Sequence, residues 1–115
     1  MSWNPVKARQ VLDSSKIAQF IREVDKVAGY ELASGRELAL IKENEQKVAI
    51  YVAVAPRNMP DVLVDREYMP TANKGGRNAD VGPICQSLGF DRQAYSLHVK
   101  SEEGLLNLLN WYQYA

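Results

Sequence analysis

Cysteine, histidine and net charge are scarce in this sequence of 115 residues. The single cysteine, Cys85, has no partner for an internal disulfide, and with one histidine the chain cannot complete a structural zinc site of cysteine and histidine ligands. A lone cysteine fits a reducing compartment, so we expect a cytoplasmic protein. We assign no metal ligands and no cofactor from the sequence.

Long apolar runs are also missing. No stretch approaches the roughly 20 apolar residues of a membrane helix, and the first residues lack a signal-peptide core. The 14 Lys+Arg balance 14 Asp+Glu, which excludes the bulk basicity of a histone-like DNA coat. Because 46% of the residues are hydrophobic, intrinsic disorder is excluded too. We expect a single folded domain over residues 1–115, no membrane span, and only a local anion-binding surface.

The first half of the chain carries helix signals followed by strand signals. Asn4-Pro5 is typical of an N-cap with proline at the first helical position, which predicts a short helix over residues 5–12. Apolar residues at three- and four-residue spacing predict a second helix over residues 15–28, ended by Gly29 at the C′ position. An apolar stretch ending at Lys42 and the alternating stretch 47–54 then predict an antiparallel hairpin.

The hairpin's second strand is apolar on both faces, so we expect it to be central in a sheet. Residues 62–68 predict a third strand whose charges favour an edge position. Asp80 is a candidate cap for a short helix that ends at Gly89, and residues 95–99 alternate as a fourth strand. Ser101 precedes a last helix that runs nearly to the end of the chain. The predicted fold is α+β, a mainly antiparallel sheet of about four strands packed with N-terminal and C-terminal helices.

The longest loop signal carries the most informative chemistry. The run is Asn73, Lys74, Gly75, Gly76, Arg77 and Asn78, and no acidic residue lies between Glu67 and Asp80. Two glycines can expose consecutive backbone amides, and the two cations add positive charge, as in phosphate-binding loops. The spacing of a Walker A loop or a dinucleotide fold is absent, and a solvated surface turn is the alternative. Arg57 and Arg92 could extend the basic surface, whereas Arg66 is expected to pair with acidic neighbours on the sheet.

Aromatic residues gather at both termini, among them Trp3, Trp111 and Tyr114. They either pack the N-terminal segment against the last helix or form a patch for a partner protein or a second copy of the chain. The second interpretation makes these three residues candidate partner-binding residues.

Enzyme signals are weaker. Glu45-Gln46-Lys47 superficially resembles half of a metal-dependent nuclease pattern, with Glu37 or Asp25 as the other acid, but it falls in the hairpin turn. No catalytic residue is assigned. The function hypothesis is a small non-enzymatic binding module for nucleic acid, with DNA as the first candidate. The alternatives are a protein-interaction module, such as an inhibitor, immunity or accessory protein, and a small metal-dependent nuclease.

Overall fold

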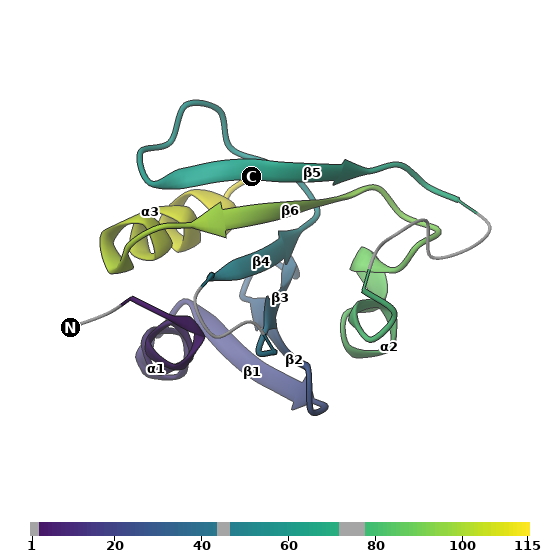
Figure 1. Ribbon diagram of the computed structural model, residues 1–115, viewed down its shortest axis with the longest axis horizontal. Coiled ribbons are helices and arrows are strands. Elements are labelled where there is room, and N and C mark those ends of the chain that lie inside the picture. Colours follow the sequence, from purple (N-terminus) through teal and green to yellow (C-terminus); the bar gives the residue numbers. More distant parts are fainter. Residues whose placement is uncertain (1–2, 44–46, 72–77) are drawn as a thin grey trace.

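The computed structural model describes residues 3–43, 47–71 and 78–115 (Figure 1). Along the chain the elements are α1 (Pro5–Ser14), β1 (Ala18–Glu23), β2 (Val27–Leu32), β3 (Glu37–Ile41), β4 (Ala49–Val52), β5 (Val62–Tyr68), α2 (Val81–Ile84), the 3-10 helix η1 (Gln86–Leu88), β6 (Ala94–Val99) and α3 (Glu102–Tyr112). The strands form one six-stranded sheet in the order β1-β2-β3-β4-β6-β5, with every neighbouring pair antiparallel. The α+β prediction is confirmed, but the sheet has six strands where about four were predicted.

The helix predicted over residues 15–28 is wrong, because this segment forms β1, the turn that follows it and the start of β2. Its three- and four-residue apolar spacing does not mark a buried face, since Phe20 and Val24 are 42% and 40% exposed. The chain instead turns between the strands, where the Val24 amide donates to the Val27 carbonyl at 2.9 Å. Pairing with the neighbouring β3 buries β2, so tertiary contacts override the local periodicity.

Gly29 therefore does not end a helix; it lies in the middle of β2, opposite Ala39 of β3. A Cβ atom at this position would lie 2.4 Å from Cγ2 of Ile84 and 3.0 Å from Sγ of Cys85. The absence of a side chain lets α2 approach the sheet closely, so this glycine serves packing.

The other strand predictions are confirmed. β3 and β4 form the predicted antiparallel hairpin, all four residues of β4 are buried, and β4 lies inside the sheet. β5 lies at one edge, as its charges indicated, and β1 lies at the other. Both edge strands contain a β-bulge, which disturbs the regular ladder that a further strand would need for pairing.

The capping predictions hold at both ends of the chain. The Asn4 side chain accepts from the Lys7 amide at 3.0 Å to start α1, which continues two residues beyond the predicted Leu12. Ser101 caps α3 in the same way, accepting from the Gly104 amide at 3.0 Å. The Asp80 side chain does not cap α2, and the single predicted helix is split into α2 and η1 before Gly89.

The helices cover the two faces of the sheet (Figure 1). α1 and α3 pack on one face, where Leu12 and Leu108 share a buried cluster with Ile50. α2 and η1 pack on the other face, where Ile84 and Leu88 belong to a second cluster. The second face consequently carries the short helices and the ends of the segment between β5 and α2.

An ion cluster joins α1 to the sheet. The Glu23 carboxylate accepts from Arg9 Nη1 at 2.6 Å and Nη2 at 2.8 Å, and Lys42 donates to the same carboxylate. The hydrogen bond from Arg9, followed by that from Lys42, lowers the pKa of Glu23 from 4.5 to about 2. The carboxylate therefore stays ionised well below the pH at which an ordinary glutamate is protonated.

Candidate nucleic-acid interface

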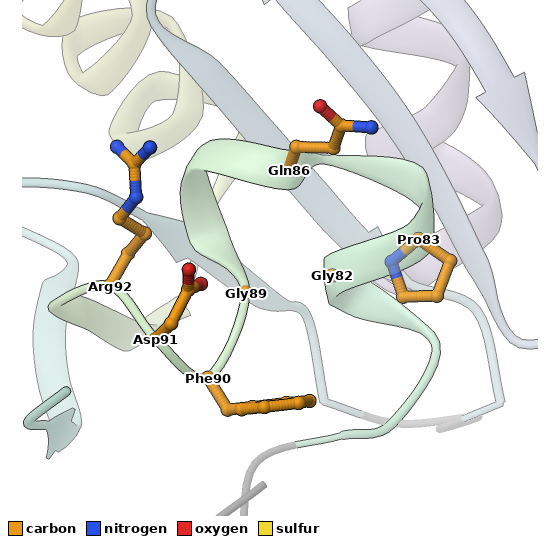
Figure 2. Close-up of a pocket in the computed structure, with 7 residues that line it drawn as sticks. All are labelled: Gly82, Pro83, Gln86, Gly89, Phe90, Asp91 and Arg92. Atoms are coloured by element: carbon orange, nitrogen blue, oxygen red, sulfur yellow. The ribbon is translucent and has the colours of Figure 1, made fainter. Parts of the chain in front are cut away.

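An open pocket of about 500 Å³ lies on the α2 side of the molecule (Figure 2). Its residues come from α2, from η1 and from the turn that leads into β6. They are Gly82, Pro83, Gln86, Gly89, Phe90, Asp91 and Arg92. The volume falls within the range of about 300–1,000 Å³ that is typical of small-molecule sites.

Glycines give the pocket its shape. A Cβ on Gly82 would lie 3.2 Å from the Cα of Gly89, so the backbones of α2 and the following turn approach each other closely. A Cβ on Gly89 would lie 3.3 Å from Oδ1 of Asp91. Side chains at either position would crowd this concave surface, and the bare backbone keeps it open.

Hydrogen bonds, one of them fully buried, hold α2 and η1 against the sheet. Oε1 of Glu37 in β3 accepts from the Ser87 amide at 3.0 Å and from the Ser87 hydroxyl at 2.5 Å. The Cys85 thiol donates to the Leu38 carbonyl at 3.5 Å, and its burial raises its pKa to about 12. The pocket is therefore built on elements fixed to the core.

The polar side chains at the pocket have no partners among the residues that the structure describes. Gln86, Asp91 and Arg92 are exposed, and none of their side chains forms a hydrogen bond or ion pair with another described residue. Phe90 is 44% exposed despite being a large apolar residue. Asp91 and Arg92 are neighbours in sequence yet do not pair with each other, so both charges are available to a ligand.

The turn that lines the pocket is bonded to Thr71, which precedes the predicted glycine loop in the sequence. The Thr71 amide donates to the Phe90 carbonyl at 2.8 Å, which fixes the start of the segment 71–78 to the turn that lines the pocket. Of the loop residues singled out from the sequence, Asn73, Lys74, Gly75, Gly76 and Arg77 lie outside the described residues, whereas Asn78 is described. The phosphate-binding role of the loop stays a prediction.

Asn78 is held by four hydrogen bonds at the other end of this segment, one of them from the Val81 amide to its backbone carbonyl at 3.2 Å. Its amide donates to the Tyr51 hydroxyl at 3.3 Å, its Nδ2 donates to Glu43 at 3.1 Å, and its Oδ1 accepts from the Asp80 amide at 2.9 Å. These contacts anchor the end of the segment to β4 and to the chain after β3. They make Asn78 a positioning residue in this structure.

The structure places the two outlying arginines differently. Arg92 lines the pocket, in the turn before β6. Arg57 is exposed in the connection before β5, at the end of that strand where Val62 pairs with Val99. The seven residues of β5 separate the two ends by roughly 20 Å, at about 3.3 Å a residue. Arg57 is thus not brought beside the pocket.

Two residues that the sequence analysis did not assign to the site contribute to this side of the molecule. Arg66 forms no ion pair with a described carboxylate, contrary to the expected pairing, and its guanidinium lies 5.0 Å from the ring centroid of Tyr68. The Tyr68 ring stacks on Tyr51, the residue that binds the end of the glycine segment. The second of these residues is Phe90. The sequence did carry a signal for it, because an apolar ring directly before Asp91 and Arg92 stands out in a polar turn.

The aromatic residues of the termini divide between packing and exposure. Trp3 is half-buried, and its Nε1 donates to the Val99 carbonyl at 2.9 Å. Trp111 is half-buried and stacks on Tyr112, whereas Tyr114 is 85% exposed. The N-terminal segment is therefore packed on the body of the protein, and partner binding by these residues stays a prediction.

The residues of the nuclease alternative are spread apart. Glu45 and Gln46 lie outside the described residues, and Lys47 forms an ion pair with Asp65 at 2.5 Å. Glu37 begins β3, at the end of the hairpin far from Lys47, and Asp25 lies in the exposed β1–β2 turn. Among the residues that the structure describes, no three acidic, histidine or cysteine side chains are grouped to hold a metal ion.

No helix in the described ranges is long and apolar enough to cross a membrane. No family model, curated protein or solved structure matches the chain.

Proposed function

We propose that this protein is a small non-enzymatic module that binds nucleic acid, with single-stranded DNA as the first ligand to test. The observation that carries the proposal is the hydrogen bond from Thr71 to Phe90. It joins the start of a basic, glycine-containing segment to a pocket that bears an exposed aromatic ring and an arginine without an ion-pair partner among the described residues.

The positive charges of the glycine-containing segment and the pocket favour binding of a polyanion at one site on the surface. Lys74 and Arg77 supply positive charge within a stretch free of acidic residues, and Gly75 and Gly76 can expose backbone amides to phosphate oxygens. Arg92 adds a third cation at the pocket. Because the formal net charge of the whole chain is +0, binding must depend on such a local group of cations.

The aromatic ring favours an unpaired strand over a duplex. Phe90 is exposed beside the pocket, and a base can stack on such a ring only when its own neighbours in the nucleic acid leave a face open. Stacking of this kind contributes about 1–3 kcal/mol per base. We therefore assign phosphate contacts to the cations and base contact to Phe90.

The test measures the salt dependence of binding. A fluorescently labelled oligothymidylate is titrated with the protein at several low salt concentrations, and log K is plotted against log salt concentration. Each phosphate contact contributes about −0.7 to the slope for a single strand. Lys74→Ala/Arg77→Ala should therefore flatten the slope by about 1.4.

A matched control removes the same charge elsewhere. Lys16 and Lys100 are exposed and form no ion pair with described residues. Lys16→Ala/Lys100→Ala should leave the slope unchanged, although the net charge falls equally. Equal slopes for both double variants would show that the glycine segment does not contact the nucleic acid. Absence of binding at low salt would refute the proposed function.

A further inference from the structure

The pocket combines groups that serve different parts of a nucleotide. Figure 2 shows Asp91 and Arg92 extending in the same direction from the turn, while the Phe90 ring extends on the side of Pro83. A carboxylate, a guanidinium and an aromatic ring thus lie within three consecutive residues around one concave surface of about 500 Å³. We infer that this pocket is a subsite for an unpaired guanine base, an inference that rests on the proposed function.

The unpaired carboxylate argues for a base and against a phosphate in the pocket. Asp91 is exposed, and its side chain forms no ion pair or hydrogen bond with a described residue. An ionised carboxylate repels a phosphate and offers only acceptor atoms. A ligand group beside Asp91 must therefore not be anionic and must present hydrogen-bond donors, as a neutral base can.

Guanine fits this requirement best among the common bases. Its Watson–Crick edge presents two adjacent donors, N1–H and the N2 amino group, to which both carboxylate oxygens can bond at once. Thymine and uracil place one donor between two acceptors, and adenine and cytosine place an acceptor nitrogen beside their amino group. A bidentate bond to Asp91 consequently selects guanine, and it acts on unpaired guanine because pairing would occupy this edge.

The neighbouring groups complete the subsite. Phe90, with 44% of its surface exposed, offers a ring on which the base can stack. Arg92 can neutralise the phosphate attached to the same nucleotide. Gly82 and Gly89 leave backbone where side chains would otherwise fill the space that a planar base needs.

The experiment compares oligonucleotides that differ in one base. Binding by the native protein is measured for a thymidine-only 12-mer, for the same strand with one central guanine, and for the strand with inosine at that position. A bidentate base contact discriminates by about 5- to 150-fold, so guanine should tighten binding by a factor in this range. Inosine lacks the N2 amino group and should lose most of this gain.

Two variants test the assigned groups. Asp91→Asn preserves the shape of the side chain but replaces one acceptor with a donor, and it should abolish the guanine preference while leaving thymidine-only binding unchanged or tighter. Phe90→Leu should weaken binding of both strands, because stacking does not depend on the base. The matched control is Asp25→Asn, which replaces an exposed carboxylate in the β1–β2 turn and should keep the preference for guanine.

The outcomes separate the subsite from the proposed function. Thymidine-only binding with no gain from guanine overturns the guanine subsite and leaves nucleic-acid binding standing. An equal gain from inosine, or a gain that survives Asp91→Asn, also overturns the assignment to Asp91. If none of the strands binds at low salt, the proposed function and the subsite both fail.

Discussion

Replacing Gly29 by alanine tests the contact on which the position of the pocket depends. The new Cβ would lie 2.4 Å from Cγ2 of Ile84 and 3.0 Å from Sγ of Cys85, so α2 must move away from β2. Overpacking of this kind costs about 1–3 kcal/mol. Alanine also restricts the unfolded chain, which offsets about 0.5–1 kcal/mol. We expect a net loss of about 1–2 kcal/mol in the free energy of unfolding.

Urea unfolding of a double-mutant cycle measures this contact. Ile84→Ala removes the Cγ2 methyl that the new Cβ would strike, whereas Ile84→Val removes only Cδ1 and retains that methyl. Gly29→Ala should therefore cost less than about 0.5 kcal/mol in the Ile84→Ala background and nearly its full amount in the Ile84→Val background. The valine variant serves as the matched control, because both substitutions shorten the same side chain.

Two results would refute this reasoning. An unchanged unfolding midpoint for Gly29→Ala would show that α2 is not in close contact with β2. Equal costs in the two Ile84 backgrounds would show that the loss arises from the strand itself. If the reasoning holds, Gly29→Ala should also weaken oligonucleotide binding, since α2 and the turn after η1 line the pocket.

Three further predictions concern buried and charged groups. Tyr112→Phe should cost about 1–3 kcal/mol in urea unfolding, because its hydroxyl donates to the Glu37 carbonyl at 2.7 Å and accepts from the Ala53 amide at 2.8 Å; an unchanged midpoint would contradict these bonds. Glu23 has a depressed pKa of about 2, so the native protein should have a higher free energy of unfolding than Glu23→Gln. This difference should be complete above pH 4.5 and decline toward pH 2, and a pH-independent difference would contradict the reasoning. Cys85, with its pKa raised from 9.0 to about 12, should react with iodoacetamide at pH 8 about 1,000-fold more slowly than an unfolded control, and rapid labelling would mean that α2 opens.

Local signals in the sequence were sufficient for several elements. Asn4 and Ser101 each bind an orphan amide of the first helical turn, so they mark the starts of α1 and α3 without reference to the rest of the chain. The apolar alternation of β4 and the charges of β5 indicated an interior and an edge strand. These predictions succeeded because a cap acts within one turn and a strand repeats every two residues.

The segment from residue 15 to residue 28 shows the limit of such signals. Its apolar spacing is compatible with a helix, but partners distant in sequence decide its structure, since β2 is buried between β1 and β3. Gly29 shows the same limit, because its role depends on Ile84 and Cys85, more than fifty residues later in the chain. No local window contains that information.

The candidate site divides along the same line. The sequence by itself determined a cationic, glycine-containing segment in a chain of balanced charge, together with Arg92 as a nearby candidate. Only the tertiary structure decided that Thr71 meets Phe90, that Arg92 and Asp91 share a pocket, and that Arg57 lies at the far end of β5. The reason is physical: charge and backbone freedom are properties of the residues themselves, whereas a pocket exists only where packing brings separate segments together.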